Sequence, residues 1–219
     1  MNRSLRLFLC LTILISLPAT AAAYLFEEDF EDGVADGFSP VGPGWEVSSG
    51  TYNCETTGFE IYSSSLFGDP YWGDVIISFD IKSVDSVNHL LRFRINDFED
   101  FYIVNLRSAP WNDVTIQRTM NTNVTLIGAA YAGFDNDVWH HVEVVLNGFQ
   151  SEVYLDGEMV LLTQDYEMPD RLYTGQCAVV GYSGGVAMHQ IVSYDNVVVM
   201  SSVVAVEQVT LSSVKALFE

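Results

Sequence analysis

A chain of 219 residues with 29 acidic and 9 basic side chains has a formal net charge of −20 at pH 7. The field of such a protein repels phosphate backbones and anionic lipid, which argues against nucleic-acid binding and against binding to a membrane surface. Neutral glycans, cations and basic partners remain compatible with this charge, although most of the carboxylates are expected to serve as solvated surface.

The first 23 residues predict an export signal that is removed from the mature protein. Arg3 and Arg6 form a basic start, Leu7–Leu17 is an apolar run too short for a finished membrane anchor, and small residues end at Ala23. A buried N-terminal helix is the alternative. Cleavage leaves residues 24–219 with 9 − 2 = 7 basic side chains. We therefore expect a protein that is secreted, periplasmic or held at the cell surface, without a membrane span after cleavage.

Short alternating runs between Gly, Asn, Asp and Pro residues predict strands throughout residues 24–200. The clearest run is Val75–Lys82, whose apolar side chains all fall on one face. Other strands are expected at residues 24–30, 45–47, 51–55, 60–64, 89–95, 101–107, 114–118, 125–127, 175–182 and 186–200, and three more within 138–162. This spacing predicts an all-β fold, an antiparallel two-sheet jelly-roll sandwich.

Two tight turns organise the three strands of residues 138–162. Asn147-Gly148 and Asp156-Gly157 stand between alternating runs. Such pairs favour two-residue hairpin loops because both residues accept positive φ. We therefore predict a three-stranded meander in this segment.

The chain beyond the sandwich, residues 201–219, is predicted to be a linker followed by a short helix over 210–218. A helix of this length is marginal unless it docks on another element. A frayed tail is the alternative.

Two cysteines remain after removal of the signal, Cys54 and Cys177. In an exported protein such a pair is compatible with one disulfide that closes a long loop. The alternative is two small buried thiols on neighbouring strands. Their wide separation gives no metal-site spacing.

Several of these pieces stand in the order found in a known superfamily. Along the chain they are Asp29–Gly33 (DFEDG), Trp45, Gly50–Tyr52 (GTY), Asp74–Asp80 (DVIISFD), Phe101–Val104 (FYIV), Trp139–Val142 (WHHV), Val153–Gly157 (VYLDG) and Tyr194–Val199 (YDNVVV). In these segments, residues 24–200 resemble the concanavalin A-like lectin and glucanase superfamily, in its laminin-G-like and laminarinase-like branches. The resemblance implies the same two-sheet fold, which carries lectins, enzymes and adhesive modules alike.

The resemblance also implies a structural calcium ion where the first and last strands meet. It would be held by an N-terminal carboxylate, a carbonyl of the second hairpin and an aspartate of the last strand. These are Glu28 or Asp29, Gly50, and Asp195. Calcium prefers several oxygen ligands, and an ion in this place joins both ends of the domain. The alternative is that Asp195-Asn196 ends a bulge and that the acidic start of the chain is solvated.

Laminarinase-like glucanases carry their catalytic carboxylates on one strand, as Glu-x-Asp-x-x-Glu or Glu-x-Asp-x-Glu. This chain is expected to carry neither pattern. The nearest carboxylates, Asp97, Glu99 and Asp100, are predicted to lie in a solvated turn. His140 and His141 adjoin on one strand, so they point to opposite faces and make a poor metal pair. We therefore expect binding rather than catalysis, with a glycoside hydrolase or lyase of the same fold as the alternative.

Glycan binding requires aromatic rings that stack on sugars and a few fixed polar partners. Outward positions on the central strands and two loops at their rim supply the candidates: Arg92, Arg94, Tyr102, Asn105, Trp72 and Trp111. For the arginines the alternative role is ion pairing with carboxylates, and for the tryptophans it is loop anchoring. These residues predict a lectin-like domain that binds a polysaccharide or other glycan. A surface module that binds protein is a further alternative.

Overall fold

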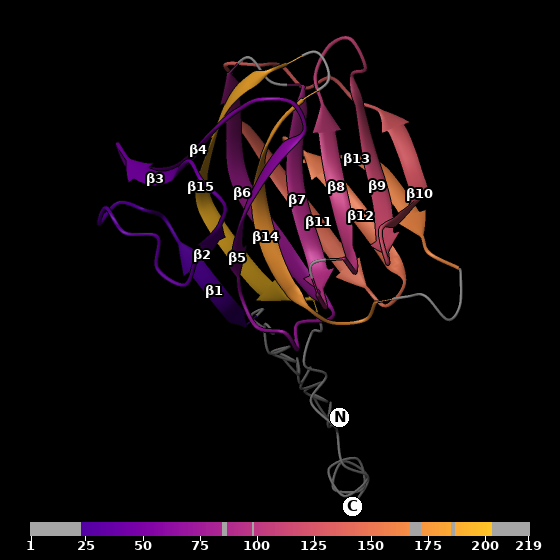
Figure 1. Ribbon diagram of the computed structural model, residues 1–219. Coiled ribbons are helices and arrows are strands. Elements are labelled where there is room, and N and C mark those ends of the chain that lie inside the picture. The colour runs from indigo at the N-terminus through magenta and orange to yellow at the C-terminus, as the bar shows by residue number, and fades with distance from the viewer. Residues whose placement is uncertain (1–22, 85–86, 98, 167–171, 185–186, 203–219) are drawn as a thin grey trace, which may run out of the picture. The chain divides into compact units, whose positions relative to one another are not determined.

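The computed structural model describes residues 23–84, 87–97, 99–166, 172–184 and 187–202, and these form two sheets that lie one behind the other (Figure 1). In the eight-stranded sheet the order is β13 (Glu158–Gln164), β12 (Gln150–Leu155), β11 (His140–Asn147), β6 (Val75–Val84), β15 (His189–Ser201), β4 (Thr51–Thr57) and β3 (Trp45–Ser48), with β1 (Tyr24–Glu28) paired to β15. In the seven-stranded sheet it is β10 (Asn123–Tyr131), β9 (Asp113–Met120), β8 (Phe101–Arg107), β7 (Asn88–Ile95), β14 (Gln176–Ser183), β5 (Ile61–Phe67) and β2 (Ser39–Val41). Neighbouring strands are antiparallel, which confirms the predicted sandwich.

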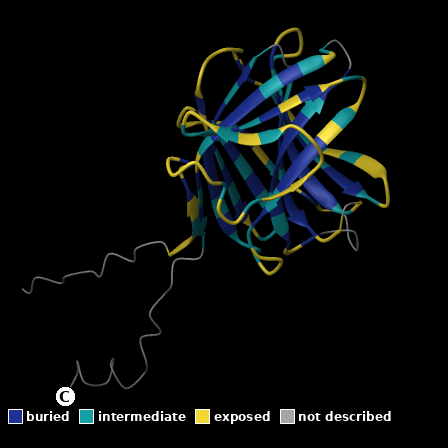
Figure 2. Ribbon diagram, turned by 60° about the vertical axis from the view of Figure 1, so that its left-hand side comes forward, coloured by how far each residue is buried: buried dark blue, intermediate teal, exposed yellow. Residues whose placement is uncertain are grey.

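Alternation along the strands decides which side chains form the core. On β6, Ile77, Phe79 and Ile81 point inward and are buried, while Asp80 between them points outward. Burial of each such side chain contributes about 1.5–3 kcal/mol relative to exposure. Figure 2 shows the result, with buried segments along the strands and exposed ones mainly in the connecting loops.

Two tyrosine hydroxyls join the sheets through hydrogen bonds inside this core. The hydroxyl of Tyr194 on β15 lies 3.0 Å from the carbonyl oxygens of both Leu90 and Val180 in the opposite sheet. The hydroxyl of Tyr52 on β4 lies 2.9 Å from Oγ of Ser65 on β5. These bonds satisfy polar groups that burial would otherwise leave without partners.

The predicted meander over residues 138–162 is confirmed, with one difference in its first turn. Asn147 pairs with Gln150, so the loop residues are Gly148 and Phe149 rather than Asn147 and Gly148. Gly148 alone has positive φ there, 56°, as a turn with glycine at its first central position requires. In the second loop Asp156 and Gly157 have φ of 51° and 81°, as predicted.

The two ends of the chain fall largely outside the described residues. The predicted export signal (1–23) lies outside them except for its last residue, and so does the predicted linker and tail (201–219) except for residues 201 and 202. Within the described ranges, no helix has the length and hydrophobicity needed to cross a membrane.

Both cysteines are free, so the disulfide between Cys54 and Cys177 is not formed in the structure. Each is buried, but in opposite sheets, rather than on neighbouring strands. A Cβ at Gly181 would lie 2.5 Å from the Cys54 sulfur, which places that thiol four residues along β14 from Cys177. Four residues of strand span about 13 Å, well beyond the reach of a disulfide.

Candidate functional site

The outward sides of the two sheets differ sharply in charge. On the five central strands of the seven-stranded sheet the outward residues, here called the open face, are Tyr62, Ser64, Leu66, Gln176, Ala178, Val180, Tyr182, Asn88, Leu90, Arg92, Ile95, Phe101, Ile103, Asn105, Arg107, Asp113, Thr115, Gln117 and Thr119. Among them the one carboxylate is Asp113, and its Oδ1 accepts a hydrogen bond from Nε of Arg107 at 2.6 Å. The open face therefore carries no unpaired acidic side chain at these positions.

The outward side of the eight-stranded sheet, here called the acidic face, has the opposite character. Its outward carboxylates are Glu27, Glu46, Glu55, Asp80, Glu143, Glu152 and Asp195. Nearby cations are few: Lys82 lies over the Trp139 ring, and Nδ1 of His141 lies 2.7 Å from a carboxylate oxygen of Asp80. An anionic ligand is therefore disfavoured on this face.

Arg92 lies at the centre of the open face, over an aromatic bed. The central carbon of its guanidinium is 4.3 Å from the ring centroid of Phe101 and 5.6 Å from that of Tyr62. Nη1 donates to Oγ of Ser64 at 3.2 Å, while Nε is buried without a hydrogen-bond partner. Burial lowers the pKa of Arg92, and the nearby Tyr62 opposes the shift. An arginine remains cationic nevertheless.

Two tyrosines form the accessible edge of this aromatic bed. The rings of Tyr62 on β5 and Tyr182 on β14 lie 4.4 Å apart, and Tyr62 is 51% exposed. Farther along the same strands is a hollow of about 150 Å³, lined by Leu66, Ile95, Asn96, Asp97 and Gln176. The carboxylate of Asp97 is engaged in its own turn, where it accepts the backbone N–H groups of residues 99 and 100.

Two further predicted ligand residues share this face, although neither touches Arg92 in the contacts above. Asn105 points outward, and its Nδ2 donates to the side-chain oxygen of Asn88 at 3.1 Å. Trp111 is 43% exposed beyond the end of β8, with the guanidinium of Arg107 over its ring. These two residues extend the polar and aromatic surface toward that end of the sheet.

Tyr102 and Arg94 do not point outward, contrary to the prediction. Tyr102 takes the core side of β8, where it stacks on Phe93 and its hydroxyl donates to Asp165 at 2.6 Å. A bulge in β7, with φ of 50° at Arg94, turns that side chain away from the open face. Its guanidinium donates hydrogen bonds to the carbonyl oxygens of Leu172 and Gly73. There Arg94 is 4% exposed and lies 3.5 Å from Asp74.

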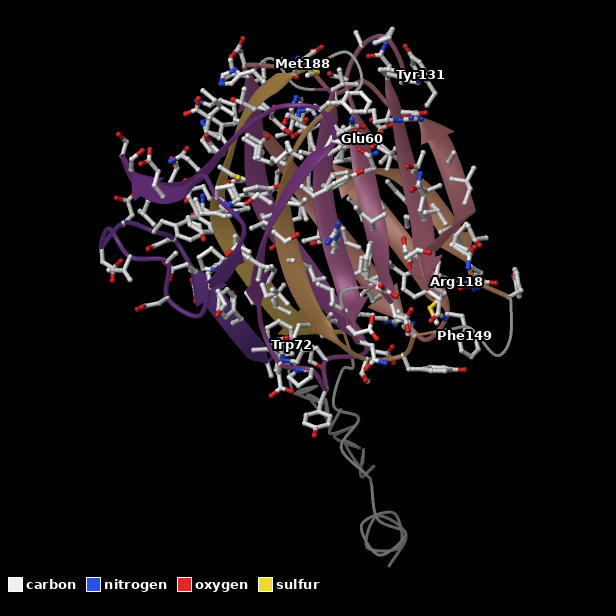
Figure 3. All side chains as sticks on the ribbon, viewed as in Figure 1. Glu60, Trp72, Arg118, Tyr131, Phe149 and Met188 are labelled. Atoms are coloured by element: carbon white, nitrogen blue, oxygen red, sulfur yellow. The ribbon has the colours of Figure 1, made fainter. Side chains whose placement is uncertain are left out.

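The two tryptophans do not rim one face. Trp72 packs against Phe26 and Phe67 at the lower end of the sandwich, where Figure 3 labels it. Trp111 lies in the loop between β8 and β9, where the carbonyl oxygen of the next residue, Asn112, accepts the backbone N–H of Ala132 just beyond β10. Figure 3 labels Tyr131, the last residue of β10, at the opposite end of the sandwich from Trp72. For Trp72 the alternative role, anchoring a loop, is the one observed.

The half-exposed Tyr62 and its partly buried neighbour Tyr182 are not among the predicted ligand residues. Tyr62 lies in a segment whose prediction as a short strand was right, but its face depends on the register with β14. Tyr182 ends the predicted strand 175–182, and nothing in its local pattern indicates a partner 120 residues earlier in the chain. Only the pairing of β14 with β5 places the two tyrosines side by side on the open face.

Contrary to the expectation that the chain carries no glucanase pattern, one occurs in residues 27–31, but its geometry does not suit catalysis. Glu27, Asp29 and Glu31 fit Glu-x-Asp-x-Glu, yet β1 ends at Glu28 and Phe30 has φ of 56°. The three carboxylates therefore do not follow one strand face, as the retaining pair requires.

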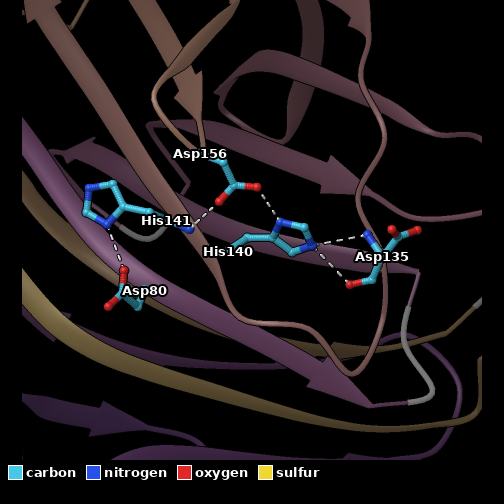
Figure 4. Close-up of polar contacts among 5 residues, drawn as sticks. All are labelled: Asp80, Asp135, His140, His141 and Asp156. Carbon is cyan, nitrogen blue, oxygen red and sulfur yellow. Dashed lines mark hydrogen bonds and ion pairs between the residues drawn. The ribbon is translucent and has the colours of Figure 1, made fainter.

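The histidine pair on β11 points to opposite faces, as predicted (Figure 4). Nδ1 of His140 lies 2.8 Å from Oδ2 of Asp156, on the inner side, while His141 contacts Asp80 outside. Burial would raise the pKa of Asp156, but the hydrogen bonds and charges of the two histidines outweigh it and lower the pKa. The pair braces the β12–β13 turn.

The residues of the expected calcium site lie near the junction of β1 and β15, but they differ in whether their oxygens are already engaged in hydrogen bonds. Glu28 is buried, and its two oxygens accept the backbone N–H groups of Phe30 and Asp36 at 2.7 and 2.8 Å. A Cβ at Gly50 would lie 3.0 Å from a carboxylate oxygen of Glu31. In the part of the chain that the structure describes, no group of three or more His, Cys, Asp or Glu side chains is arranged to hold a metal.

Two antiparallel sheets with this strand order define a concanavalin A-like, lectin-like sandwich, the fold that the resemblance implied. No protein-family model matches the chain, and no curated protein sequence matches it. Among solved structures, the carbohydrate-binding module CBM66 from Bacillus subtilis has a TM-score of 0.62 at 20% identity, over 75% of this chain and 96% of that one. The carbohydrate recognition domain of Emp47p has a TM-score of 0.63 at 11% identity, over 84% and 99%. A galectin-like Bacillus subtilis protein of unknown function has 0.62 at 11%, over 82% and 96%. At such identities these likenesses establish the fold.

Proposed function

We propose that this protein binds carbohydrate through the open face, at the cluster of Tyr62, Tyr182 and Arg92. The observation that carries the proposal is the half-exposed ring of Tyr62, which packs against the partly buried Tyr182 beside a fixed guanidinium. An accessible ring offers a flat apolar surface to a sugar, and the polar groups around it fix the sugar's orientation. Two of the similar folds are named as a carbohydrate-binding module and a carbohydrate recognition domain, which supports the same function.

Replacement of the exposed ring tests this proposal. Tyr62→Ala is expected to weaken binding about tenfold on a glycan array and to reduce retention on an insoluble polysaccharide, because loss of a stacking ring costs ~1–2 kcal/mol. Tyr154→Ala is the matched control, since Tyr154 points outward from the acidic face. Equal binding by Tyr62→Ala and the unaltered protein would contradict the assignment.

Under this proposal the protein is a non-catalytic binding domain. Support comes from the open face, whose one carboxylate is held by Arg107. Prolonged incubation with a polysaccharide panel is expected to release no products, and product formation would favour a hydrolase or lyase instead. An array without hits, together with specific capture of one protein, would favour the adhesive alternative.

Calcium at the junction of the first and last strands remains part of the proposal. Burial raises the pKa of Asp195, and the nearby carboxylates of Asp80, Glu31 and Asp29 raise it further. A cation there would relieve this repulsion, with Asp29, Asp195 and the Gly50 carbonyl as its candidate ligands. Glu28 fits less well because both its oxygens already accept N–H groups. An unfolding midpoint that does not change when a chelator removes calcium would argue against the ion.

We also propose that the protein is exported. The support is the amino-terminal signal pattern, and mass spectrometry of the mature chain is expected to find Tyr24 as its first residue. Retention of residues 1–23 would contradict export by cleavage.

A further inference from the structure

We infer that the saccharide bound at the open face carries an acidic group, a carboxylate or a sulfate, which pairs with Arg92. This inference rests on the proposed carbohydrate-binding function and specifies its ligand class. It starts from the four arginines that the structure describes. Three of them have aspartate partners: Arg94 with Asp74, Arg107 with Asp113 and Arg118 with Asp165.

Arg92 is the exception, because no carboxylate in the described residues forms an ion pair with it. Its pairing neighbours across the sheet are Ile103 on β8 and Ala178 on β14. In a chain with 29 acidic residues, a largely buried cation without a counter-ion is unusual. Burial of an unpaired charge is costly, so an external anion that supplies the missing partner would be stabilised there.

The immediate surroundings suit an anion on a sugar rather than a free ion. The guanidinium stacks on Phe101 and is tied to Ser64, so its fork is held in place before any ligand arrives. A preorganised fork favours carboxylate and related oxyanions over neutral hydroxyls. Tyr62 lies directly beside it, so one sugar ring can stack on the tyrosine while its acidic substituent reaches Arg92.

The net charge of the protein does not prevent this binding. The carboxylates of the acidic face lie across two sheets, which are stacked about 10 Å apart. Exposed charges at that separation are largely screened at physiological salt, where the Debye length is about 8 Å. The local charge of the open face therefore decides which ligand is accepted.

The test compares three oligosaccharides of equal length by calorimetry in 0.15 M NaCl: a uronic acid oligosaccharide, its carboxyl-reduced neutral form and a sulfated form. At least one acidic form is expected to bind ten times or more as tightly as the neutral one, and the two acidic arms distinguish carboxylate from sulfate. Equal affinity for all three would overturn the inference while leaving carbohydrate binding intact. If none of the three oligosaccharides binds and the glycan array gives no hits, the proposed carbohydrate-binding function itself is contradicted.

Substitution at Arg92 provides the second arm. Arg92→Gln is expected to reduce the acidic-to-neutral affinity ratio to about one, and Arg92→Lys to restore part of it, because lysine keeps the charge without the planar fork. Residual binding of the neutral oligosaccharide by Arg92→Gln shows that the variant is folded, and an unchanged melting midpoint gives an independent check. An unchanged affinity ratio in folded Arg92→Gln would overturn the inference.

Discussion

At the scale of single residues, Tyr194 illustrates how one polar group connects the two layers. It is fully buried on β15, and its hydroxyl lies near the backbone of both β7 and β14. Burial raises the pKa of Tyr194, so the hydroxyl stays protonated and donates to a carbonyl oxygen. The hydroxyl oxygen of Tyr194 in turn accepts the backbone N–H of Val180 at 3.3 Å.

We predict that Tyr194→Phe lowers the free energy of unfolding by about 1–3 kcal/mol, because buried groups lose a hydrogen-bond partner without a change in shape. Chemical denaturation checks this value. Tyr154→Phe is the control and is expected to change it by less than about 0.5 kcal/mol, since that hydroxyl bonds Glu152 on the outer face. Similar losses for both variants would show that the inter-sheet bonds contribute little.

The two thiols allow a second test at this scale. Burial raises the pKa of Cys54 to about 11 and that of Cys177 to about 12. Because both pKa values lie well above 8, almost no thiolate, the reactive form of cysteine, is present at pH 8. Iodoacetamide is expected to leave the native mature protein unlabelled and to label both cysteines after unfolding without reductant. A mass lower by two hydrogen atoms, with no labelling in denaturant, would reveal a disulfide that the structure does not contain.

At the scale of elements, the last strand contains an irregularity that the rest of the sheet accommodates. Asp195 pairs with Asp80 and Val198 with Ser78, so β15 has one residue more than β6 over this stretch. Asn196 takes up the difference with φ of 49°, and its Nδ2 donates to Asp80 at 2.8 Å. The bulge considered at Asp195-Asn196 is therefore present.

Two substitutions at Asn196 separate backbone strain from the lost hydrogen bond. Both Asn196→Gly and Asn196→Val remove the bond to Asp80, but valine is far less suited than glycine to a left-handed conformation. We expect the valine variant to unfold with a free energy at least ~1–2 kcal/mol lower than the glycine variant. An equal free energy of unfolding for the two variants, measured by denaturant titration, would mean that the positive φ at residue 196 is not required for the stability of the fold.

Elements were predicted well where alternation and turn residues are local, and less well where a strand departs from regularity. Val75–Lys82 shows plain alternation and forms all of β6 except its last two residues. The three-residue β2 contains Pro40 and has no room for a pattern, so it was missed. Arg94 was placed on the wrong face because a bulge cannot be read from alternating residues. Tyr62 was overlooked as a ligand residue because its neighbour Tyr182 is brought in by long-range pairing.

At the scale of the whole molecule, charge is distributed unevenly between the outer faces of the sandwich. The acidic face gathers carboxylates on neighbouring strands, and the raised pKa of Asp195, caused by burial and then by Asp80, records their repulsion. Because proteins with high net charge are destabilised by self-repulsion, added salt should stabilise this fold. The open face, by contrast, contributes little to that repulsion.

Two variants that change the net charge by the same amount test whether location matters. Glu143→Gln removes a negative charge from the acidic face, and Gln117→Lys adds a positive one to the open face. In 10 mM NaCl, we expect Glu143→Gln to raise the melting midpoint by about 1–3 °C, since relief of surface repulsion is worth ~0.2–1 kcal/mol. Gln117→Lys should raise it less, because it lies across two sheets from those carboxylates. In 0.2 M NaCl the difference between the variants should largely disappear. Equal shifts at low salt would show that the protein responds to its total charge, and that the contrast between its two faces has no effect on stability.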